Sequence, residues 1–494
     1  MVRHGPSQGR PGWDHMYPAS ARCAPARLGA LRPYLGRMCA ATANSLVAIM
    51  LLASSATAQG HGDAGMPADH ASFVATGDST LDELIRAALE GNSTVRAAAD
   101  RRTASRARVL PAGTRSDPNL QAGLITIPIA KPSLTDDNFT MLMVGLQQSF
   151  PYPGKLALRT RVAALDVDAV DALLANARLT VVRDVKAAYY EVAYLDRALE
   201  IANRSRTVLV DVIRVTESHY GTGTGLQQDV LKARLEATRL AETANALIEA
   251  RVTALAQLNA ILERASDAPL PAASVPVRLA RAAVAENAAS IRFTAQTLGA
   301  RAADSPLPAV TTLQTIAISH SPMLREHEAR IAAQAARVEL ARKDSKPDFD
   351  VTVQYNHRVA YPDLLTAQVS IPLRLQRSAK QDQAMAENSA ELSALEAEHR
   401  ASVNALNARV ASLASDVERD RTQLALYVKA ILPQAHAAVT SALATYQAGR
   451  ADLLTLLDLQ NTVFTSETAY FRALSDFAKA VADLEQTVGA PVLP

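Results

Sequence analysis

Cysteine and tryptophan are almost absent from this sequence. Its 494 residues include two cysteines, Cys23 and Cys39, and one tryptophan, Trp13, all near the N-terminus. Disulfides and thiol chemistry are therefore excluded for the rest of the chain. Aromatic residues make up 4% of the sequence, a composition that suits closely packed, alanine-rich helices. No run after residue 60 is apolar over eighteen residues, so a membrane span there would have to be a β-barrel.

The first 58 residues have the order of a secretory leader. Four arginines between residues 22 and 37 precede the apolar run 46–53, and residues 56–58 match a small-residue cleavage site. We predict that residues 1–58 are a signal segment, with translation starting as late as Met16 or Met38. The mature chain would begin near Gln59 with a flexible tail, 59–80. The alternative for the apolar run is a buried strand.

Charge gives little hint of a nucleic-acid partner. The leader holds six arginines and one aspartate, so the remaining chain has 45 basic and 48 acidic residues. This balance argues against nucleic-acid binding. No cysteine follows the apolar run, so no acceptor for an N-terminal lipid is present there.

Four short sequence patterns occur twice in the same order. They are 88–95 and 317–324, the prolines Pro118 and Pro347, segments 148–151 and 369–372, and Tyr220–Gly223 and Tyr446–Gly449. Their nearly constant offset predicts an internal two-fold repeat. Its halves are 81–263 and 313–490, and a connector, 264–312, carries a short helix near 278–297.

Each half is predicted to run helix, strand, strand, very long helix, tight turn, long helix. The strands are expected at 119–127, 140–149, 349–356 and 365–371, and the last two alternate apolar and polar residues clearly. This alternation is typical of a water-filled membrane barrel, although a soluble hairpin with one buried face is the alternative. Four strands cannot close a barrel, so strands in a membrane would require oligomerisation; three chains would supply twelve.

The long helices have coiled-coil patterning. From Lys155 to about His219 there is no proline or glycine, and apolar residues recur by sevens from Val167 to Leu209. A helix of roughly 65 residues would reach on the order of 100 Å. The second half repeats the pattern from about 378 to 446, with a kink expected at Pro433. A long dimeric coiled coil is the alternative, but it leaves the strands unexplained.

No catalytic motif is present, so the sequence does not predict an enzyme or a cofactor. His320 and His327 are seven residues apart on an expected helix, beside Glu326 and Glu328, and a solvated helix face explains them as well as a metal site does. In the tail, His61, Met66 and His70 offer imidazole and thioether ligands suited to Cu(I), although incidental polar residues are the simpler reading.

At this point the chain resembles the TolC-like outer-membrane efflux proteins over roughly residues 81–490. The resemblance rests on the repeat, on the turns beginning at Tyr220 and Tyr446, and on the segment Phe150–Lys155. It implies a homotrimer with a twelve-stranded β-barrel in the outer membrane and a coiled-coil α-helical tunnel across the periplasm. The implied partners are a periplasmic adaptor protein and an inner-membrane pump. With Met141 and Met143, the segment Phe150–Lys155 is most similar to the heavy-metal branch, the CusC- and CzcC-like channels.

The resemblance also assigns site residues. The turns would form tips that contact the adaptor, at Tyr220, Gly221, Gly223, Gly225, Tyr446 and Gly449. The resemblance implies an aspartate gate at the periplasmic end, with Asp229 and Asp458 at acidic positions and Thr455 where the family has a second acid. Asp452, three residues past Gly449, is a further gate candidate from its position alone. Asp452 also suits a helix start.

We therefore expect a passive export duct of a tripartite efflux system, carrying heavy-metal cations (Cu/Ag or Zn/Co/Cd). A multidrug or other small-molecule duct is the first alternative. A structural coiled-coil protein of the envelope is the second.

Overall fold

The structure is a computed structural model that describes residues 76–129, 132–284, 306–448, 450 and 452–493. The predicted leader, the tail residues His61, Met66 and His70, and Gly449 lie outside these ranges. So does most of the helix expected near 278–297, of which the described part contains α7 (Val277–Ala282).

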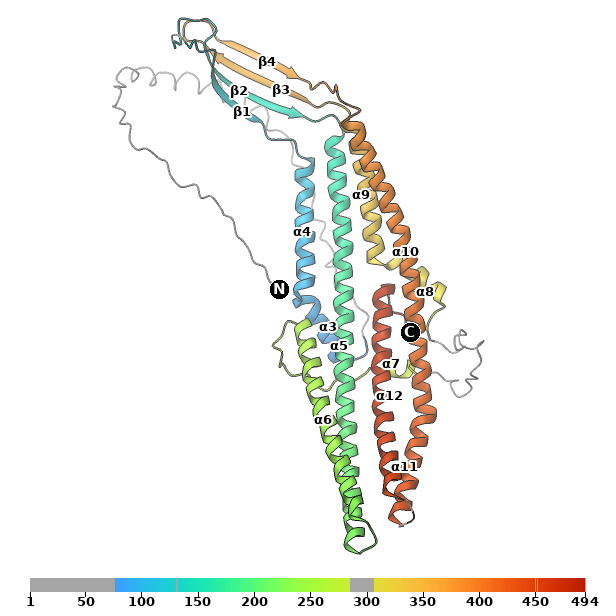
Figure 1. The fold of residues 1–494 in the computed structure, drawn as a ribbon. Helices are drawn as coiled ribbons and strands as arrows, with labels where there is room; N and C mark the ends of the chain where they lie inside the picture. The colour runs from blue at the N-terminus through green and yellow to red at the C-terminus, as the bar shows by residue number, and fades with distance from the viewer. Residues whose placement is uncertain (1–75, 130–131, 285–305, 449, 451, 494) are drawn as a thin grey trace, which may run out of the picture. The chain divides into compact units, whose positions relative to one another are not determined.

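The described chain is mainly helical, and the order helix, helix, strand, strand, long helix occurs both before and after residue 285 (Figure 1). Its elements before that point are α3 (Ser79–Gly91), α4 (Ser93–Gly113), β1 (Asn119–Ile125), β2 (Met141–Phe150), α5 (Lys155–Gly221), α6 (Gln227–Ile261) and α7. Those after it are α8 (Val310–His320), α9 (Pro322–Asp344), β3 (Phe349–His357), β4 (Leu364–Ser370), α10 (Gln381–Leu426), a π-helical turn (Tyr427–Ile431), α11 (Leu432–Gln447) and α12 (Leu453–Val488).

Side-chain caps fix where the shorter helices begin. Asp78 accepts hydrogen bonds from the backbone N–H groups of Thr80 and Leu81 at the start of α3, and Asn92 caps α4 in the same way. Ser321 caps α9, where Pro322 occupies the first turn. These caps satisfy backbone donors that have no partner within a helix.

The long helix α5 is the scaffold of the described chain. It has 67 residues, which corresponds to about 100 Å. Towards the strands it packs against α4 and α9, and in its other half against α6 and α12 (Figure 1). Its apolar seam is buried against these neighbours, including Val181, Val185, Val192 and Leu195. Helices of both halves therefore pack against α5: α4 and α6 from the first half, and α9 and α12 from the second.

The predicted kink at Pro433 corresponds to a π-helical turn. The turn Tyr427–Ile431 separates α10 from α11, and Pro433 follows it directly. Proline has no N–H to donate to the carbonyl four residues back and its ring collides with that turn. A wider π-helical turn relieves both problems without ending the helix.

The four strands form one antiparallel sheet in the order β1-β2-β3-β4. Phe150 pairs with Phe349 in the register of β2 and β3, and their rings stack with centroids 5.3 Å apart. Strand β1 ends at Ile125 rather than at the predicted residue 127, because Thr126 has a φ of 60°, which extended backbone does not allow. β1 and β4 form the two edges, and neither has a second strand partner among the residues that the structure describes.

The register gives the sheet one apolar and one polar face. Across the strands, Leu120, Leu146, Val353 and Ala367 lie in one row, and Ala122, Val144, Tyr355 and Leu365 lie in the next. The opposite face carries glutamines that are hydrogen-bonded to one another. The Gln121 amide donates to Gln147 at 2.8 Å and accepts from Gln354 at 3.5 Å. On that same polar face lie Met141 and Met143, since they share the parity of Gln147.

The apolar face is exposed in a single chain. Leu120 and Leu365 are 74% and 75% exposed. A contiguous exposed apolar surface of this kind marks contact with another chain or with lipid. Separately, no helix among the described residues is both long enough and apolar enough to cross a membrane.

Candidate functional site

The turn between α5 and α6 is held by hydrogen bonds to the last carbonyls of α5. The backbone N–H groups of Thr224 and Gly225 both donate to the His219 carbonyl at 2.9 Å. Gly223 has a φ of 75°, which side chains other than glycine rarely adopt. Tyr220 is 50% exposed, and Gly221 and Gly223 are exposed as well. The sequence-predicted tip residues of the first half therefore lie together on the surface of this turn.

The second turn, between α11 and α12, lies partly outside the described residues. The backbone N–H of Arg450 donates to the Thr445 carbonyl at 3.0 Å. Asp452 occupies the N-cap position of α12, but its side chain makes no capping hydrogen bond. A simple capping role therefore does not account for Asp452, although its charge still favours the helix start.

Tyr446 links the two helix pairs rather than standing at the surface. It is 7% exposed, its hydroxyl lies 3.0 Å from that of Thr216 on α5, and its ring lies 5.6 Å from the ring of His219. Around it, α5, α6, α11 and α12 share one core with Ala202, Leu209, Val212, Ala233, Leu240, Ala442, Leu453, Leu456 and Leu457. Sequence reasoning missed Thr216 and His219, because the contact joins residues 230 positions apart.

Removing the Tyr446 hydroxyl should loosen this link. Tyr446→Phe and Thr216→Val are each expected to lower the free energy of unfolding by about 1 kcal/mol. The double variant should cost less than the sum of the two, because both remove the same hydrogen bond. Denaturation of the four proteins gives the coupling energy, and strictly additive losses would contradict the pairing.

The three candidate acids lie near the ends of α6 and α12. Asp229 is in the first turn of α6 and half-buried, while Asp452 and Asp458 are exposed on α12. Thr455 is exposed between them. Within one chain these groups do not form a cluster of ion pairs, so their joint action would depend on neighbouring copies.

The segment Phe150–Lys155 forms the joint between sheet and helices. Gly154 has a φ of 87° and directly precedes α5, and the Lys155 side chain is 1% exposed. The Lys155 ammonium donates to Asp348 at 2.8 Å and to the Lys346 carbonyl at 2.9 Å, and lies 3.2 Å from Asp344. Burial alone would raise the pKa of Asp348, but the hydrogen bond from Lys155 holds it below its usual range. The segment thus has a role in packing, independent of any cargo.

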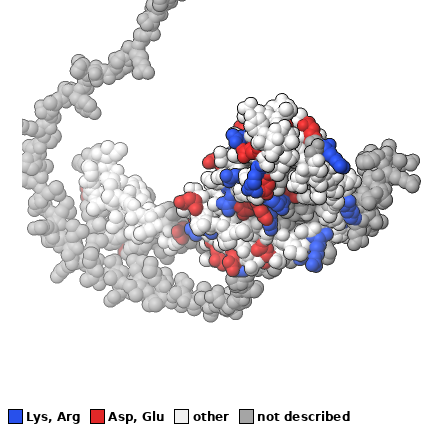
Figure 2. All heavy atoms as spheres, turned by 90° about the horizontal axis from the view of Figure 1, so that it is seen from below, with Lys and Arg blue, Asp and Glu red and all other residues white. Residues whose placement is uncertain are grey.

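A band of ion pairs joins α5 and α12 midway along the helices. Lys186 pairs with Glu485 at 2.7 Å and Arg472 with Glu191 at 2.8 Å, while Lys479 also contacts Glu191. Burial would raise the pKa of Glu191, but Lys479 and Arg472 hold it below its usual range. Seen from below, the end of the molecule carries interspersed basic and acidic side chains (Figure 2).

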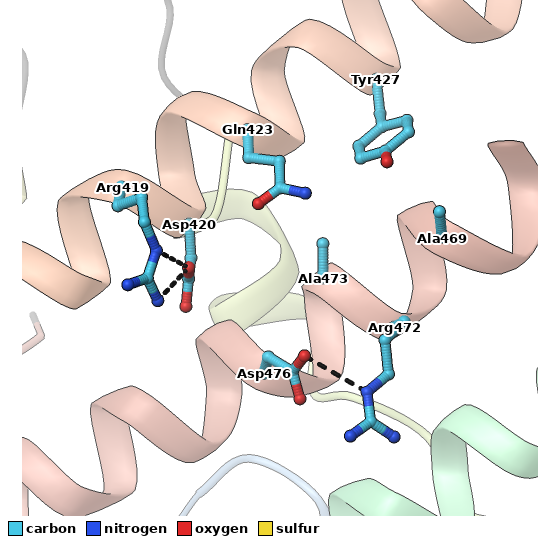
Figure 3. Close-up of a pocket in the computed structure, with 8 residues that line it drawn as sticks. All are labelled: Arg419, Asp420, Gln423, Tyr427, Ala469, Arg472, Ala473 and Asp476. Carbon is cyan, nitrogen blue, oxygen red and sulfur yellow. Dashed lines mark hydrogen bonds and ion pairs between the residues drawn. The ribbon is translucent and has the colours of Figure 1, made fainter.

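A small open pocket lies beside this band, between α10 and α12 (Figure 3). Arg419 donates to Asp420 at 2.9 Å, and Arg472 donates to Asp476 at 3.2 Å. Burial raises the pKa of Asp420 even though Arg419 opposes the shift. Both guanidinium groups are thus paired with carboxylates of their own helix. The pocket is lined by residues of α10, the π-helical turn and α12: Arg419, Asp420, Gln423, Tyr427, Ala469, Arg472, Ala473 and Asp476.

The structure also locates the sequence-predicted metal candidates. His327 faces His399 across α9 and α10, with ring centroids 6.3 Å apart, whereas His320 is an exposed residue at the end of α8. Among the described residues, no group of three or more His, Cys, Asp or Glu side chains is arranged to hold a metal ion.

The described chain thus combines a four-stranded sheet that has an exposed apolar face with long paired helices. The family model described as outer membrane efflux protein matches residues 84–264 and 313–490. The chain belongs to this family. Its members are channels rather than enzymes, and the protein resides in the outer membrane with its helical part in the periplasm.

Solved structures of outer-membrane channels share this fold. VceC from Vibrio cholerae is 18% identical, with a TM-score of 0.66 and coverage of 84% of this chain and 98% of VceC. CusC is 15% identical (TM-score 0.67, covering 84% and 92%), and the open state of MtrE from Neisseria gonorrhoeae is 18% identical (TM-score 0.64, covering 84% and 90%). A search of curated proteins found no match.

Proposed function

We propose that three copies of this chain form a passive export duct, with a twelve-stranded barrel in the outer membrane and a helical tunnel in the periplasm. The observation that carries the proposal is the open sheet. Within the described part of the chain, strands β1 and β4 have unpaired outer edges, and the apolar face between them is exposed. In lipid every backbone polar group needs a partner, so β1 of one copy would pair with β4 of the next until the ring closes.

The helices support the same assembly. On α6, an apolar stripe that includes Leu231, Leu235 and Val252 is 50–58% exposed, although α6 packs along α5 with its other side. A neighbouring copy would cover this stripe and continue the helical wall. We also infer that the two matching halves are an internal repeat, because the same order of elements recurs in the two matched segments.

The partners would be a periplasmic adaptor protein and an inner-membrane pump, which supplies the energy that a duct lacks. The tip at Tyr220–Gly225 would contact the adaptor, because it lies at the end of the α5–α6 pair and is exposed (Figure 1). Tyr446 is buried within its own chain, so we assign it to the packing that supports the tips.

Substitution of Gly223 tests the tip. Gly223→Glu should abolish resistance while leaving the trimer in the membrane, because it adds strain at a positive φ and a charge on the contact surface. Gly223→Asn is the matched control, since asparagine tolerates this backbone conformation and adds no charge. Growth of cells in the presence of the toxic cargo measures export. Normal export by Gly223→Glu would overturn the assignment.

The periplasmic end would close through rings of carboxylates. Three-fold symmetry multiplies each of Asp229, Asp452 and Asp458, and such rings attract cations and resist anions. We expect Asp458→Ala to raise the conductance of trimers in planar bilayers and to lower cation selectivity, with Asp229→Ala acting in the same direction. Asn461→Ala, an exposed neighbour on α12, is the control. Unchanged conductance in both Asp variants would put the gate elsewhere.

The cargo would be heavy-metal cations, with Cu(I) or Ag(I) favoured over Zn(II), Co(II) or Cd(II). Met141 and Met143 support this choice because they lie on the polar face of the sheet, which would line the barrel, and thioethers are soft ligands suited to Cu(I). Organic drugs are the alternative cargo. A deletion strain challenged separately with these metals and with dyes tests the choice: restored metal resistance on complementation supports it, and sensitivity to dyes alone contradicts it.

A further inference from the structure

The helices next to the sheet follow the order of the strands. α4 packs against α5, α5 against α9, and α9 against α10, while the strands run β1-β2-β3-β4. α4 and α10 are therefore the outer helices of this row, as β1 and β4 are the outer strands (Figure 1). In the proposed ring of three copies, on which this inference rests, α10 of one copy lies beside α4 of the next.

The internal repeat pairs each residue of α4 with one of α9. One offset holds on both sides of these helices: residue 84 with 313, where the matched family segments begin, and Pro118 with Pro347. Gln334 of α9 is buried and donates to Asn388 of α10 at 3.1 Å, and its counterpart Ser105 is buried where α4 packs against α5. The contact of α4 with α5 thus matches that of α9 with α10.

A second face of α9 packs against α5, and the matching face of α4 is open. Arg337 donates two hydrogen bonds to the Asp166 carboxylate of α5, at 2.7 and 2.9 Å, and Ala333, one turn earlier on α9, is fully buried. Their counterparts on α4, Arg108 and Ala104, are both exposed. Among the described residues, no ion pair involves Arg108. A face that is covered on α9 is therefore uncovered on α4 in a single chain.

α10 carries acidic side chains where α5 has Asp166. One offset relates α5 to α10 near the sheet: Pro151 with Pro372, and the buried Leu174 with the buried Leu395. At this offset Asp166 corresponds to Glu387, and Glu391 follows one turn later on the same side of the helix. Both glutamates are exposed, and neither makes an ion pair in the part of the chain that the structure describes.

We propose that Glu387 of one copy pairs with Arg108 of the next, with Glu391 as a second acid beside it. The pair would reproduce between copies the contact that Arg337 and Asp166 make within one. The exposed alanine face of α4 lets the two helices approach closely, and the opposite charges fix which faces meet. Three such contacts, one at each joint between copies, would close the helical wall next to the sheet.

Chemical cross-linking in outer membranes that carry the full-length chain tests the contact directly. With a short bis-maleimide reagent, Arg108→Cys/Glu387→Cys should give a covalent species of three chains, because each joint would hold one cysteine from either copy. Arg108→Cys/Glu396→Cys is the matched control. Glu396 is also exposed on α10 but lies about 180° around the helix from Glu387, so this variant should remain largely monomeric.

Charge reversal tests the pairing itself. Arg108→Glu should lower the temperature at which the trimer dissociates, and so should Glu387→Arg/Glu391→Arg, because each brings like charges together at all three joints. The variant that combines all three substitutions restores opposite charges and should regain most of the loss. Glu396→Arg should leave the dissociation temperature unchanged.

Two results would overturn this contact while leaving the proposed duct intact. One is a wild type that forms trimers although the Glu387→Cys variant cross-links no better than the Glu396→Cys control. The other is a combined charge-reversed variant that dissociates as readily as the single reversals. Absence of trimers in the wild type would overturn the duct as well as the contact.

Discussion

Replacing Leu365 with arginine should remove the heat-resistant trimer from the outer membrane. Leu365 is 75% exposed in the single chain and lies on the apolar face of β4. In a closed barrel that face contacts lipid, where an arginine costs about 2–4 kcal/mol near the bilayer midplane. Because the substitution is repeated in every copy, the cost applies three times per trimer.

The neighbouring residue provides the matched control. Thr366 lies on the opposite face of the same strand, next to Gln354 in the register. Thr366→Arg should leave the trimer assembled, since the lumen of a barrel is hydrated, and should alter conductance instead. Electrophoresis of unheated membranes distinguishes the two variants. Equal loss of trimer in both, or equal retention, would contradict the orientation of the sheet.

Removing the Asp348 carboxylate should have the second large effect. The buried Lys155 ammonium has Asp348 as its nearest carboxylate, and the Tyr152 N–H also donates to Asp348 at 2.7 Å. Asp348→Ala leaves a buried charge with less compensation, a change that costs about 3 kcal/mol or more. We expect low levels of trimer and a lower melting temperature in the detergent-purified protein.

Asp344 offers the comparison. It also lies near Lys155, at 3.2 Å, but its side chain is 46% exposed. Solvent screens such a pair, so Asp344→Ala should cost less than about 1 kcal/mol. Lys155→Met, which removes the charge and keeps the packing volume, should be milder than Asp348→Ala. The reverse order of stabilities would refute the interpretation of the joint as a buried charge pair.

The sequence predicted the elements whose patterns are local. The alternation from Phe349 to Asn356 gave β3 nearly to the residue, and the long run without proline or glycine after Lys155 gave α5. Pro433 predicted a local distortion of the helix. The sequence did not distinguish a kink from a π-helical turn, because both relieve the same clash. The early end of β1 depends on the positive φ of Thr126, which the sequence does not predict because threonine rarely adopts this conformation.

The site was less predictable, because its contacts join distant segments. Tyr446 read as a tip residue from the turn pattern, but its position depends on Thr216, which only the packing of α5 against α11 and α12 reveals. The segment Phe150–Lys155 suggested a heavy-metal channel, yet its lysine pairs with Asp348 in the second half.

Closure of the sheet between copies is the central claim, and cysteine cross-linking measures it directly. The sequence has no cysteine after Cys39, so no native cysteine of that part of the chain competes with an engineered pair. Cysteines at Leu120, Ala122 or Leu124 of β1, each combined with one at Leu365, Ala367 or Val369 of β4, sample the registers across the joint. Opposed residues in an antiparallel pair lie about 4.5–5.5 Å apart, within disulfide range.

The pair Leu120→Cys/Leu146→Cys is the control, because β1 and β2 hold these residues opposite each other within one chain. It should give a cross-linked monomer. We predict that oxidation of outer membranes carrying at least one β1–β4 pair yields a covalent species of three chains. The account is contradicted if every β1–β4 pair stays monomeric while the control closes, or if a single cysteine in β1 links two copies to each other.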